Sequence, residues 1–339
     1  MKIGIEIPTC TPGMMYPVPF ATVSEVVDTA LEAEQLGYYD AGGNDHLSTM
    51  QFVRKAWTNP PDYFEPLIIL AHIAAKTSVL RLTTGIMVLP MRDPVLLAKQ
   101  VATLDQLSNG RVTLGVAVGG YRDEFEAVRP DLAGANRGEF TREIIESLRA
   151  LFEQRRATYR GKYVHFEDVE SFPKPQQVPL PIYSGGNVDG SIRRAAELCQ
   201  GWLPAKIGPD RLAQGRATLT RYARAVGRDP AGMAVALQSV VCLGPTPEQA
   251  RETFLNSSFD LFRTSLRNTM TKGVGLDAYL DSNLIGTPDQ VCEKIAAYQR
   301  AGLDHLTALL FVGNTIGEMR EQIRQFARYV LPEFPEQAD

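Results

Sequence analysis

An aspartate and a histidine, Asp45 and His46, stand together at the end of a short segment, 38–45, that favours a strand. A neutral imidazole exchanges protons near neutral pH, so a histidine in this place is a candidate general acid or base. The chain has only 4 histidines, which gives weight to one at the end of a strand. A structural histidine on a loop is the alternative, and position alone leaves both interpretations open.

A second candidate is the segment Ser184-Gly185-Gly186-Asn187, which follows a predicted strand and precedes a helix beginning near Ser191. Two glycines let the backbone approach a ligand closely, and free N–H groups at a helix N-terminus suit a phosphate. A simple strand-to-helix turn also favours glycine and asparagine. Taken alone, the segment is more typical of a turn than of an anion site.

Two other glycine segments accompany predicted strands. Gly119 and Gly120 offer bare backbone on which a flat ring can lie, and the side chain of Tyr121 can stack on such a ring or cover it. Gly85 interrupts the strand predicted at 80–90 and indicates a bulge beside a ligand. A strand that narrows into a turn and an ordinary packing adjustment are the alternatives.

Short β-branched segments alternate with longer helical patterns along the chain, which is typical of an α/β fold with a parallel sheet. Eight such units favour a closed (β/α)₈ TIM barrel, in which functional residues lie at the C-terminal ends of the strands. An open doubly wound sheet is the alternative, although no GxGxxG motif follows the first strand. The strands are predicted at 2–8, 38–45, 80–90, 111–119, 181–184, 201–205, 233–243 and 305–312.

No linker divides the sequence, so we expect a single domain over residues 1–339. The segment at about 256–286 breaks the alternation near the seventh strand and is predicted to be an insertion with its own helices. The long first loop, 9–23, is expected to cover the site.

Composition narrows the classes of function. The net charge is −4 and no segment concentrates lysine and arginine, which disfavours nucleic-acid binding. The 4 cysteines are far apart and the histidines lie on unrelated elements, so neither a disulfide framework nor a metal site is expected. The sequence shows neither a signal-peptide pattern nor a transmembrane stretch, and we expect a cytoplasmic protein without a membrane partner.

Longer motifs carry a family resemblance. The stretch LTTGIMVLPMRDPVLLAKQVATLDQLSNGRVTLGVAVGGYRDEFEA, together with FPKPQQVPLPIYSGGN, SIRRAAELCQGWLP and IGTPDQVCEKIAAYQRAGLDHL, resembles the luciferase-like monooxygenases over nearly the whole chain. The resemblance implies a (β/α)₈ barrel with an insertion near strand seven. It also implies that the cofactor is reduced FMN or, in one branch of the family, an 8-hydroxy-5-deazaflavin coenzyme.

The resemblance also assigns residues. It implies a non-prolyl cis peptide within Gly85, Ile86 and Met87 that lies against the flavin ring, and a cofactor phosphate at Ser184, Gly185, Gly186 and Asn187. The segment after strand four, with Gly119, Gly120, Tyr121 and Asp123, is expected to line the ring or its ribityl chain. Asp45 and His46 match a catalytic or cofactor-contacting position. Many relatives have Gly-x-Gly-Trp or Gly-x-Gly-Glu after strand four, where this chain has Ala-Val-Gly-Gly-Tyr.

These features give three hypotheses. The leading one is a two-component FMN-dependent monooxygenase, which receives reduced flavin from a separate reductase and oxidises a small, largely apolar organic substrate with O₂. The second is a deazaflavin-dependent hydride-transfer oxidoreductase, and the third is a non-catalytic flavin-binding protein. The family also implies a homodimer through the helices that follow strands two and three.

Overall fold

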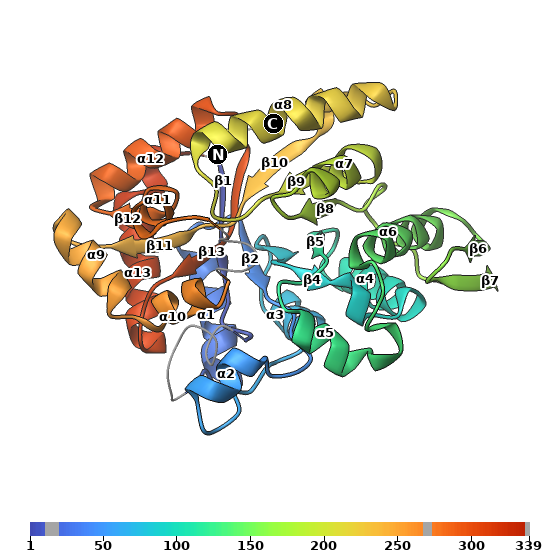
Figure 1. Cartoon of the computed structure of the whole chain (residues 1–339), viewed down its shortest axis with the longest axis horizontal. Coiled ribbons are helices and arrows are strands. Elements are labelled where there is room, and N and C mark those ends of the chain that lie inside the picture. Colours follow the sequence, from blue (N-terminus) through green and yellow to red (C-terminus); the bar gives the residue numbers. More distant parts are fainter. Residues whose placement is uncertain (11–19, 267–272, 336–339) are drawn as a thin grey trace.

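The computed structural model describes residues 1–10, 20–266 and 273–335. Its centre is a closed parallel barrel, because the last strand pairs with the first, with Lys2 beside His305 and Ile3 beside Leu306 (Figure 1). The predicted (β/α)₈ barrel is therefore confirmed. The strands around the barrel are β1 (Lys2–Glu6), β2 (Asp40–Gly43), β3 (Arg81–Thr84), β5 (Val112–Ala117), β8 (Ile182–Gly185), β9 (Gly201–Leu203), β10 (Ala234–Leu237) and β13 (His305–Phe311).

A helix follows each barrel strand and packs against its outer face (Figure 1). The helices form because apolar residues recur at helical spacing and because side chains cap their first turns, as Thr22 and Glu25 do in a capping box. In chain order these helices are α1 (Val23–Gln35), α3 (Pro66–Ala74), α4 (Pro94–Leu107), α6 (Arg137–Glu153), α7 (Asp189–Leu198), α8 (Pro209–Ala225), α12 (Pro288–Arg300) and α13 (Ile316–Tyr329).

Two predicted strands are interrupted. The segment 80–90 forms β3 and then β4 (Met87–Val88), with a cis peptide between Gly85 and Ile86. The segment 233–243 forms β10 and then β11 (Val240–Leu243), and both pieces pair with β13. The interruption at Gly85 was predicted as a bulge, whereas the prediction of one continuous strand over 233–243 was wrong. Each break turns a polar group toward the barrel axis, where the Gln238 side chain donates to the Gly85 carbonyl at 3.1 Å.

The insertion is confirmed as a region with its own helices. It contains α10 (Ser258–Ser265), α11 (Leu276–Asp281) and a strand that the sequence did not reveal, β12 (Leu284–Gly286), which extends β11 in parallel. Residues 267–272, and residues 11–19 of the long first loop, lie outside the described residues.

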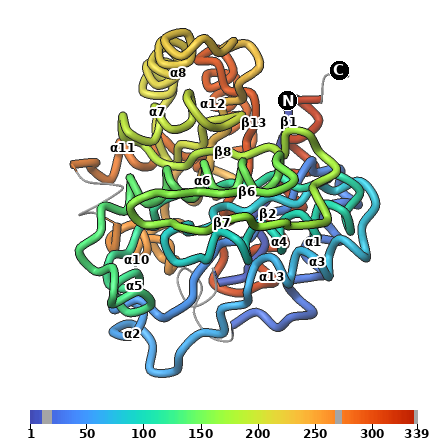
Figure 2. The backbone as a smooth tube through the Cα atoms, turned by 90° about the vertical axis from the view of Figure 1, so that its right-hand side faces the viewer, coloured from blue at the N-terminus to red at the C-terminus, as the bar shows by residue number. Residues whose placement is uncertain are grey.

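Smaller elements lie outside the barrel. The strands β6 (Ala157–Arg160) and β7 (His165–Val169) form an antiparallel hairpin, which crosses the face seen in Figure 2. Helices α2 (Gln51–Ala56) and α5 (Arg122–Val128) follow β2 and β5 at the C-terminal end of the barrel, and α9 (Pro247–Leu255) follows β11.

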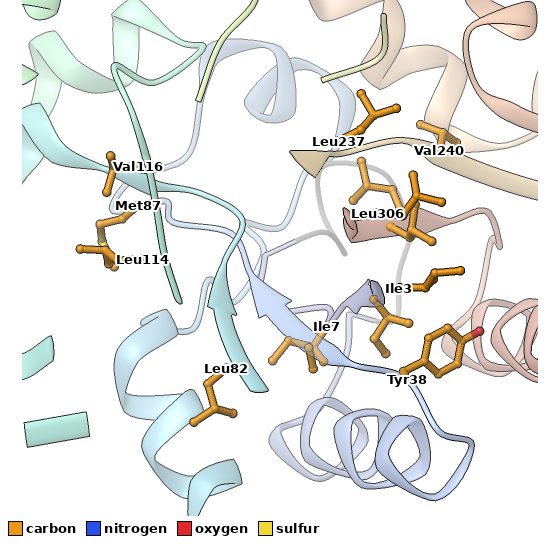
Figure 3. Close-up of a cluster of buried hydrophobic side chains, with 14 of the residues drawn as sticks. Ile3, Ile7, Tyr38, Leu82, Met87, Leu114, Val116, Leu237, Val240 and Leu306 are labelled. Carbon is orange, nitrogen blue, oxygen red and sulfur yellow. The ribbon is translucent and has the colours of Figure 1, made fainter. Parts of the chain in front are cut away.

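Apolar side chains fill the space between the barrel and its helices. In Figure 3 Met87 lies beside Leu114 and Val116, and β4 and β5 pair at Met87 and Val116. Helix α3 is apolar on nearly all sides, yet Ile68 is 67% exposed and His72 is exposed as well. Within the described residues, no helix is both long enough and apolar enough to cross a bilayer.

A polar cluster occupies the N-terminal end of the barrel interior. The Asp40 carboxylate is fully buried and accepts hydrogen bonds from Thr83 at 2.8 Å and Thr307 at 3.0 Å, while His305 Nε2 lies 3.0 Å away. Gly4 leaves the room for it, because a Cβ there would lie 1.4 Å from Asp40 Oδ1. This carboxylate ties together strands β2, β3 and β13.

We expect Asp40→Ala to lower the free energy of unfolding by roughly 3–5 kcal/mol, because it leaves buried donors without an acceptor. Urea denaturation followed by circular dichroism measures the change. Asp62→Ala, at an exposed aspartate, is the control and should change it by less than about 0.5 kcal/mol. A loss of under about 1 kcal/mol in Asp40→Ala would show that the cluster is not needed.

Candidate functional site

The C-terminal ends of the barrel strands meet at one mouth, and most of the candidate residues lie there. His46 follows β2, the Gly85–Ile86 peptide separates β3 from β4, Tyr121 follows β5, and the Gly185–Gly186 segment ends β8. The order of strands in the barrel, rather than the sequence, makes these segments neighbours.

His46 forms a pair with Glu124, not with the adjacent Asp45. His46 Nδ1 lies 2.8 Å from Glu124 Oε2, and the other carboxylate oxygen of Glu124 accepts the backbone N–H groups of Leu47 and Ser48. Because a carboxylate only accepts, Nδ1 carries the proton and Nε2 is left as the acceptor. Nε2 has no hydrogen-bond partner among the described residues, so it is available to a ligand in the mouth.

Glu124 holds the imidazole of His46, a contact that the sequence did not predict. It is 3% exposed in the first turn of α5, whereas its neighbour Asp123 accepts the Gln51 N–H at 2.8 Å near the surface. Asp123 was predicted to line the cofactor, but its carboxylate caps α2 instead. The orientation of α5 places Glu124 against His46 and its neighbour Asp123 against the start of α2. No sequence signal distinguishes them.

Aromatic rings surround the imidazole. The ring centroid of His46 lies 5.6 Å from that of Tyr63 and 6.0 Å from that of Tyr121, and Phe52 stacks on Tyr121. The Tyr121 hydroxyl lies 3.0 Å from Ser265 Oγ in α10, so the insertion closes on the site here. The Tyr63 hydroxyl is buried without a hydrogen-bond partner, and burial raises its pKa. It is thus a neutral donor that a ligand can satisfy.

Asp45 lies beneath the site. Its carboxylate is 1% exposed, accepts the Val88 N–H at 2.9 Å and forms an ion pair with Arg92, which also reaches Glu65 at 2.9 Å. Burial opposes the charge of Arg92, but hydrogen bonding and attraction from the two carboxylates outweigh it and raise the pKa of the guanidinium. The network joins the end of β2 to β4 and to the start of α3.

The break between β3 and β4 presents backbone to the barrel axis. The peptide between Gly85 and Ile86 is cis, within the three residues that the family resemblance indicated. Position 85 requires glycine, because a Cβ there would lie 2.5 Å from the Cβ of Ala308. Met87 is fully buried in the core, so only its backbone is available to a ligand at this bulge.

The Ser184–Asn187 segment packs tightly against its neighbours. Both polar atoms of the Asn187 side chain bond the backbone of Ala205, and the carbonyl of Gly186 accepts the indole N–H of Trp202 at 2.8 Å. The side chains of Ser184 and Asn187 are therefore used within the protein. What remains for an anion is the N-terminus of α7, which has no side-chain cap.

Two arginines that the sequence reading did not single out flank this helix end. Arg137, at the start of α6, donates to the carbonyls of Val118 and Gly119 at 3.2 Å. Arg194, on α7, makes no hydrogen bond or ion pair within the described residues, and its Nε is buried without a partner. Burial lowers the pKa of both guanidiniums. Unpaired buried donors beside a helix N-terminus fit a phosphate.

The glycines that follow β5 line the same side of the mouth. Gly119 has φ +82, and a Cβ there would lie 2.7 Å from a methyl carbon of Val88. Its backbone therefore runs close to β4, next to the bulge. Gly120 leads directly into Tyr121 and so sets the direction in which that ring points.

A polar network lies on the barrel axis below the mouth. Glu6 accepts from the Asn44 side chain and, at 3.2 Å, from Gln238 Nε2, which also donates to the Gly85 carbonyl. The Lys206 ammonium lies 3.5 Å from Gln238 Oε1. Burial lowers the pKa of Lys206 to about 8, and the nearby Glu6 opposes this shift.

Two cysteines at strand ends do not add a nucleophile. Burial raises the pKa of Cys10 and, to about 12, that of Cys242, so both thiols are neutral near pH 7. Both are free, buried side chains at the ends of strands.

Comparison with known proteins places this site in a family. The model of the family described as luciferase-like monooxygenase matches residues 1–305. An uncharacterised protein of Mycobacterium tuberculosis is 33% identical over 55% of this chain and 64% of its own length, so the match spans less than two thirds of that relative. An FMNH₂-dependent dimethylsulfone monooxygenase of Pseudomonas fluorescens is 28% identical over 77% of this chain and 75% of its own.

Solved structures show the same fold. The monooxygenase RslO1 from Streptomyces bottropensis has a TM-score of 0.78 at 23% identity, covering 99% of this chain and 100% of that one. An F420-dependent secondary alcohol dehydrogenase has a TM-score of 0.80 at 18% identity, with 99% of each chain covered. Identities this low show that the fold is shared and nothing beyond it. The family model, in contrast, matches residues 1–305, which is most of the sequence, and this chain therefore belongs to the luciferase-like monooxygenase family.

Proposed function

We propose that the protein is the oxygenase of a two-component system, which binds reduced FMN and uses O₂ to oxidise a small organic substrate. The observation that carries the proposal is the arrangement of the mouth. The His46–Glu124 pair, the Gly85–Ile86 bulge and the uncapped N-terminus of α7 all follow the C-terminal ends of barrel strands, namely β2, β3 and β8. The FMN-dependent relative from Pseudomonas fluorescens, matched over 77% of this chain, supports the same cofactor.

The phosphate of FMN fits the helix end beside Gly185 and Gly186. Three features supply what a phosphate needs: uncapped backbone N–H groups of α7, the unpartnered guanidinium of Arg194, and Arg137 close by. A Cβ added at Gly190 would lie 3.8 Å from Arg194 Nη1, so this arginine borders the first turn of α7.

The flavin ring fits between the bulge and the glycines after β5. Bare backbone at Gly85 and Gly119 lets a flat ring approach closely, while Ile86 and Tyr121 offer apolar surface. When bound, reduced FMN supplies the electrons that activate O₂. The protein's own part is to orient the ring and to keep water away from it with the aromatic side chains around His46.

Within this site His46 is the acid–base residue. Glu124 fixes the imidazole with the proton on Nδ1, so that Nε2 accepts or returns a proton at the reacting atoms. We assign Asp45 a positioning role, since its carboxylate is engaged by Arg92 and by the backbone of Val88. It joins the strand end that carries His46 to the strand that carries the bulge.

Hydride transfer with a deazaflavin coenzyme is the alternative function, because the same imidazole serves as its acid or base. The FMN-dependent relative from Pseudomonas fluorescens favours FMN over the deazaflavin.

Two partners belong to the proposal. A separate reductase supplies reduced flavin, and a second copy of the chain forms a homodimer through α3 and α4. Ile68 on α3 and Leu96 on α4 support the dimer, since they are 67% and 57% exposed on helices that pack together.

Anaerobic titration of the cofactor-free protein with reduced FMN, and separately with the reduced deazaflavin, tests the choice of cofactor. We expect FMN to bind at least about tenfold more tightly, which corresponds to about 1.4 kcal/mol. The reverse preference would contradict the proposal and favour hydride transfer. Failure of both ligands to bind would remove the phosphate site at Gly185–Gly186.

The tautomer of His46 is a second prediction, and it needs no substrate. At a pH of about 8.5 an ordinary imidazole is neutral, and ¹⁵N NMR of labelled histidine then reports which nitrogen carries the proton. We expect the Nδ1–H form in the native protein. In Glu124→Gln the amide donates to Nδ1 and moves the proton to Nε2. The signal is assigned by its loss in His46→Asn.

Asp123→Asn is the matched control for this measurement. It neutralises the neighbouring carboxylate, which caps α2 and does not contact the imidazole. We expect it to leave the tautomer unchanged. Identical spectra for the native protein and Glu124→Gln would show that Glu124 does not set the protonation of His46.

A further inference from the structure

Lys206 is a buried cation that lacks an ion-pair partner. It is 7% exposed, and no carboxylate oxygen of a described residue lies within 4.0 Å of its ammonium. Its contacts are Gln238 Oε1 at 3.5 Å and the ring of Phe262, whose centroid is 5.2 Å from Nζ. An ammonium has three donors, so this environment leaves most of its hydrogen-bonding capacity unused.

The protein offsets the cost of burying this charge only in part, through the attraction of the Glu6 carboxylate, which makes no ion pair with it. Burying a charge without a counter-ion is unfavourable, and proteins normally pair or ligate it. Arg92 shows the usual solution in this same fold, because two carboxylates neutralise it. Lys206 also has φ +56, a left-handed conformation that is uncommon for residues other than glycine. Both features indicate a position kept for a ligand rather than for packing.

The place of Lys206 in the barrel indicates what kind of ligand it meets. It follows β9, the sixth strand around the barrel, whereas His46 follows β2, the second. In a barrel of eight strands these two lie on opposite sides of the mouth. A molecule long enough to span the mouth can therefore present one end to His46 and the other to Lys206.

The cofactor phosphate is not the missing anion. Its proposed site lies at the end of β8, with Arg137 and Arg194 to neutralise it. The contacts of Nζ lie on the other side of β9, at Gln238 after β10 and at Phe262 in α10. The ammonium is thus directed toward the axis and the insertion.

We propose that Lys206 binds a carboxylate of the substrate, so that the substrate is an amphipathic organic acid. Its apolar part lies between Lys206 and His46, against the rings of Phe262, Tyr63 and Tyr121. The inference rests on the proposed function, since it takes His46 as the place of reaction.

Calorimetric titration of the FMN-loaded protein with octanoate and with octanamide, its neutral counterpart, tests this assignment. In the native protein we expect octanoate to bind at least about tenfold more tightly than octanamide. Lys206→Met should remove this preference and leave octanamide binding unchanged. Lys206→Arg should keep the preference, because it keeps the cation.

Three results would overturn the assignment. They are a native protein without a preference for octanoate, no octanoate binding up to about 10 mM, and a preference that survives in Lys206→Met. Replacing a buried charge with methionine is usually tolerated, and a thermal melt checks the fold. If Lys206→Met does not fold, the affinities of the native protein and of Lys206→Arg for octanoate and octanamide still test the assignment.

Comparing the affinities of FMN and riboflavin distinguishes a Lys206 that binds the cofactor phosphate from a Lys206 that binds the substrate. Arg194→Met should weaken FMN relative to riboflavin, whereas Lys206→Met should not. A phosphate-specific loss in Lys206→Met, with no octanoate preference in the native protein, would make the cofactor the source of the anion. The titrations are repeated without cofactor. A preference that depends on Lys206 in a protein that fails to bind FMN would contradict the proposed function and retain this inference.

Discussion

The pairing of β1 with β13 is the constraint on which the site depends. It closes the sheet, so that residues from the two ends of the chain share one interior. Closure brings Glu6, the last residue of β1, within hydrogen-bonding distance of Gln238 after β10, and Gln238 in turn reaches the Gly85 carbonyl across the axis. In an open sheet these groups would lie far apart and the bulge would lack its support. The barrel is thus the frame that fixes the backbone facing the cofactor.

The charged side chains at the mouth have different roles. Asp45 and Arg92 neutralise each other beneath the site and hold two strand ends together. Glu124 is buried but engaged by an imidazole and two backbone N–H groups, which fixes His46 rather than charging the pocket. Neither Lys206 nor Arg194 forms an ion pair with a described residue, and they lie one on each side of β9. A bound anion gains the most binding free energy beside a buried cation that has no ion-pair partner.

The sequence predicted the barrel well because periodicity and glycine placement are local signals. It located the bulge at Gly85 and the loop at Ser184–Asn187 for the same reason. It did not predict that His46 bonds Glu124 instead of Asp45, since that contact joins residues 78 positions apart and depends on the direction of α5. Arg194 and Lys206 were missed because a cation on a helix or after a strand resembles a surface residue until the tertiary structure buries it.

A crystal structure of the protein with FMN bound tests the central claim most directly, which is that the cofactor spans the mouth from α7 to the bulge. We expect the phosphate to contact the N-terminus of α7 and Arg194, and the flavin ring to lie on the Gly85–Ile86 peptide with His46 Nε2 facing it. A flavin bound elsewhere, or a phosphate held by Lys206 with the ring away from the bulge, would contradict the claim.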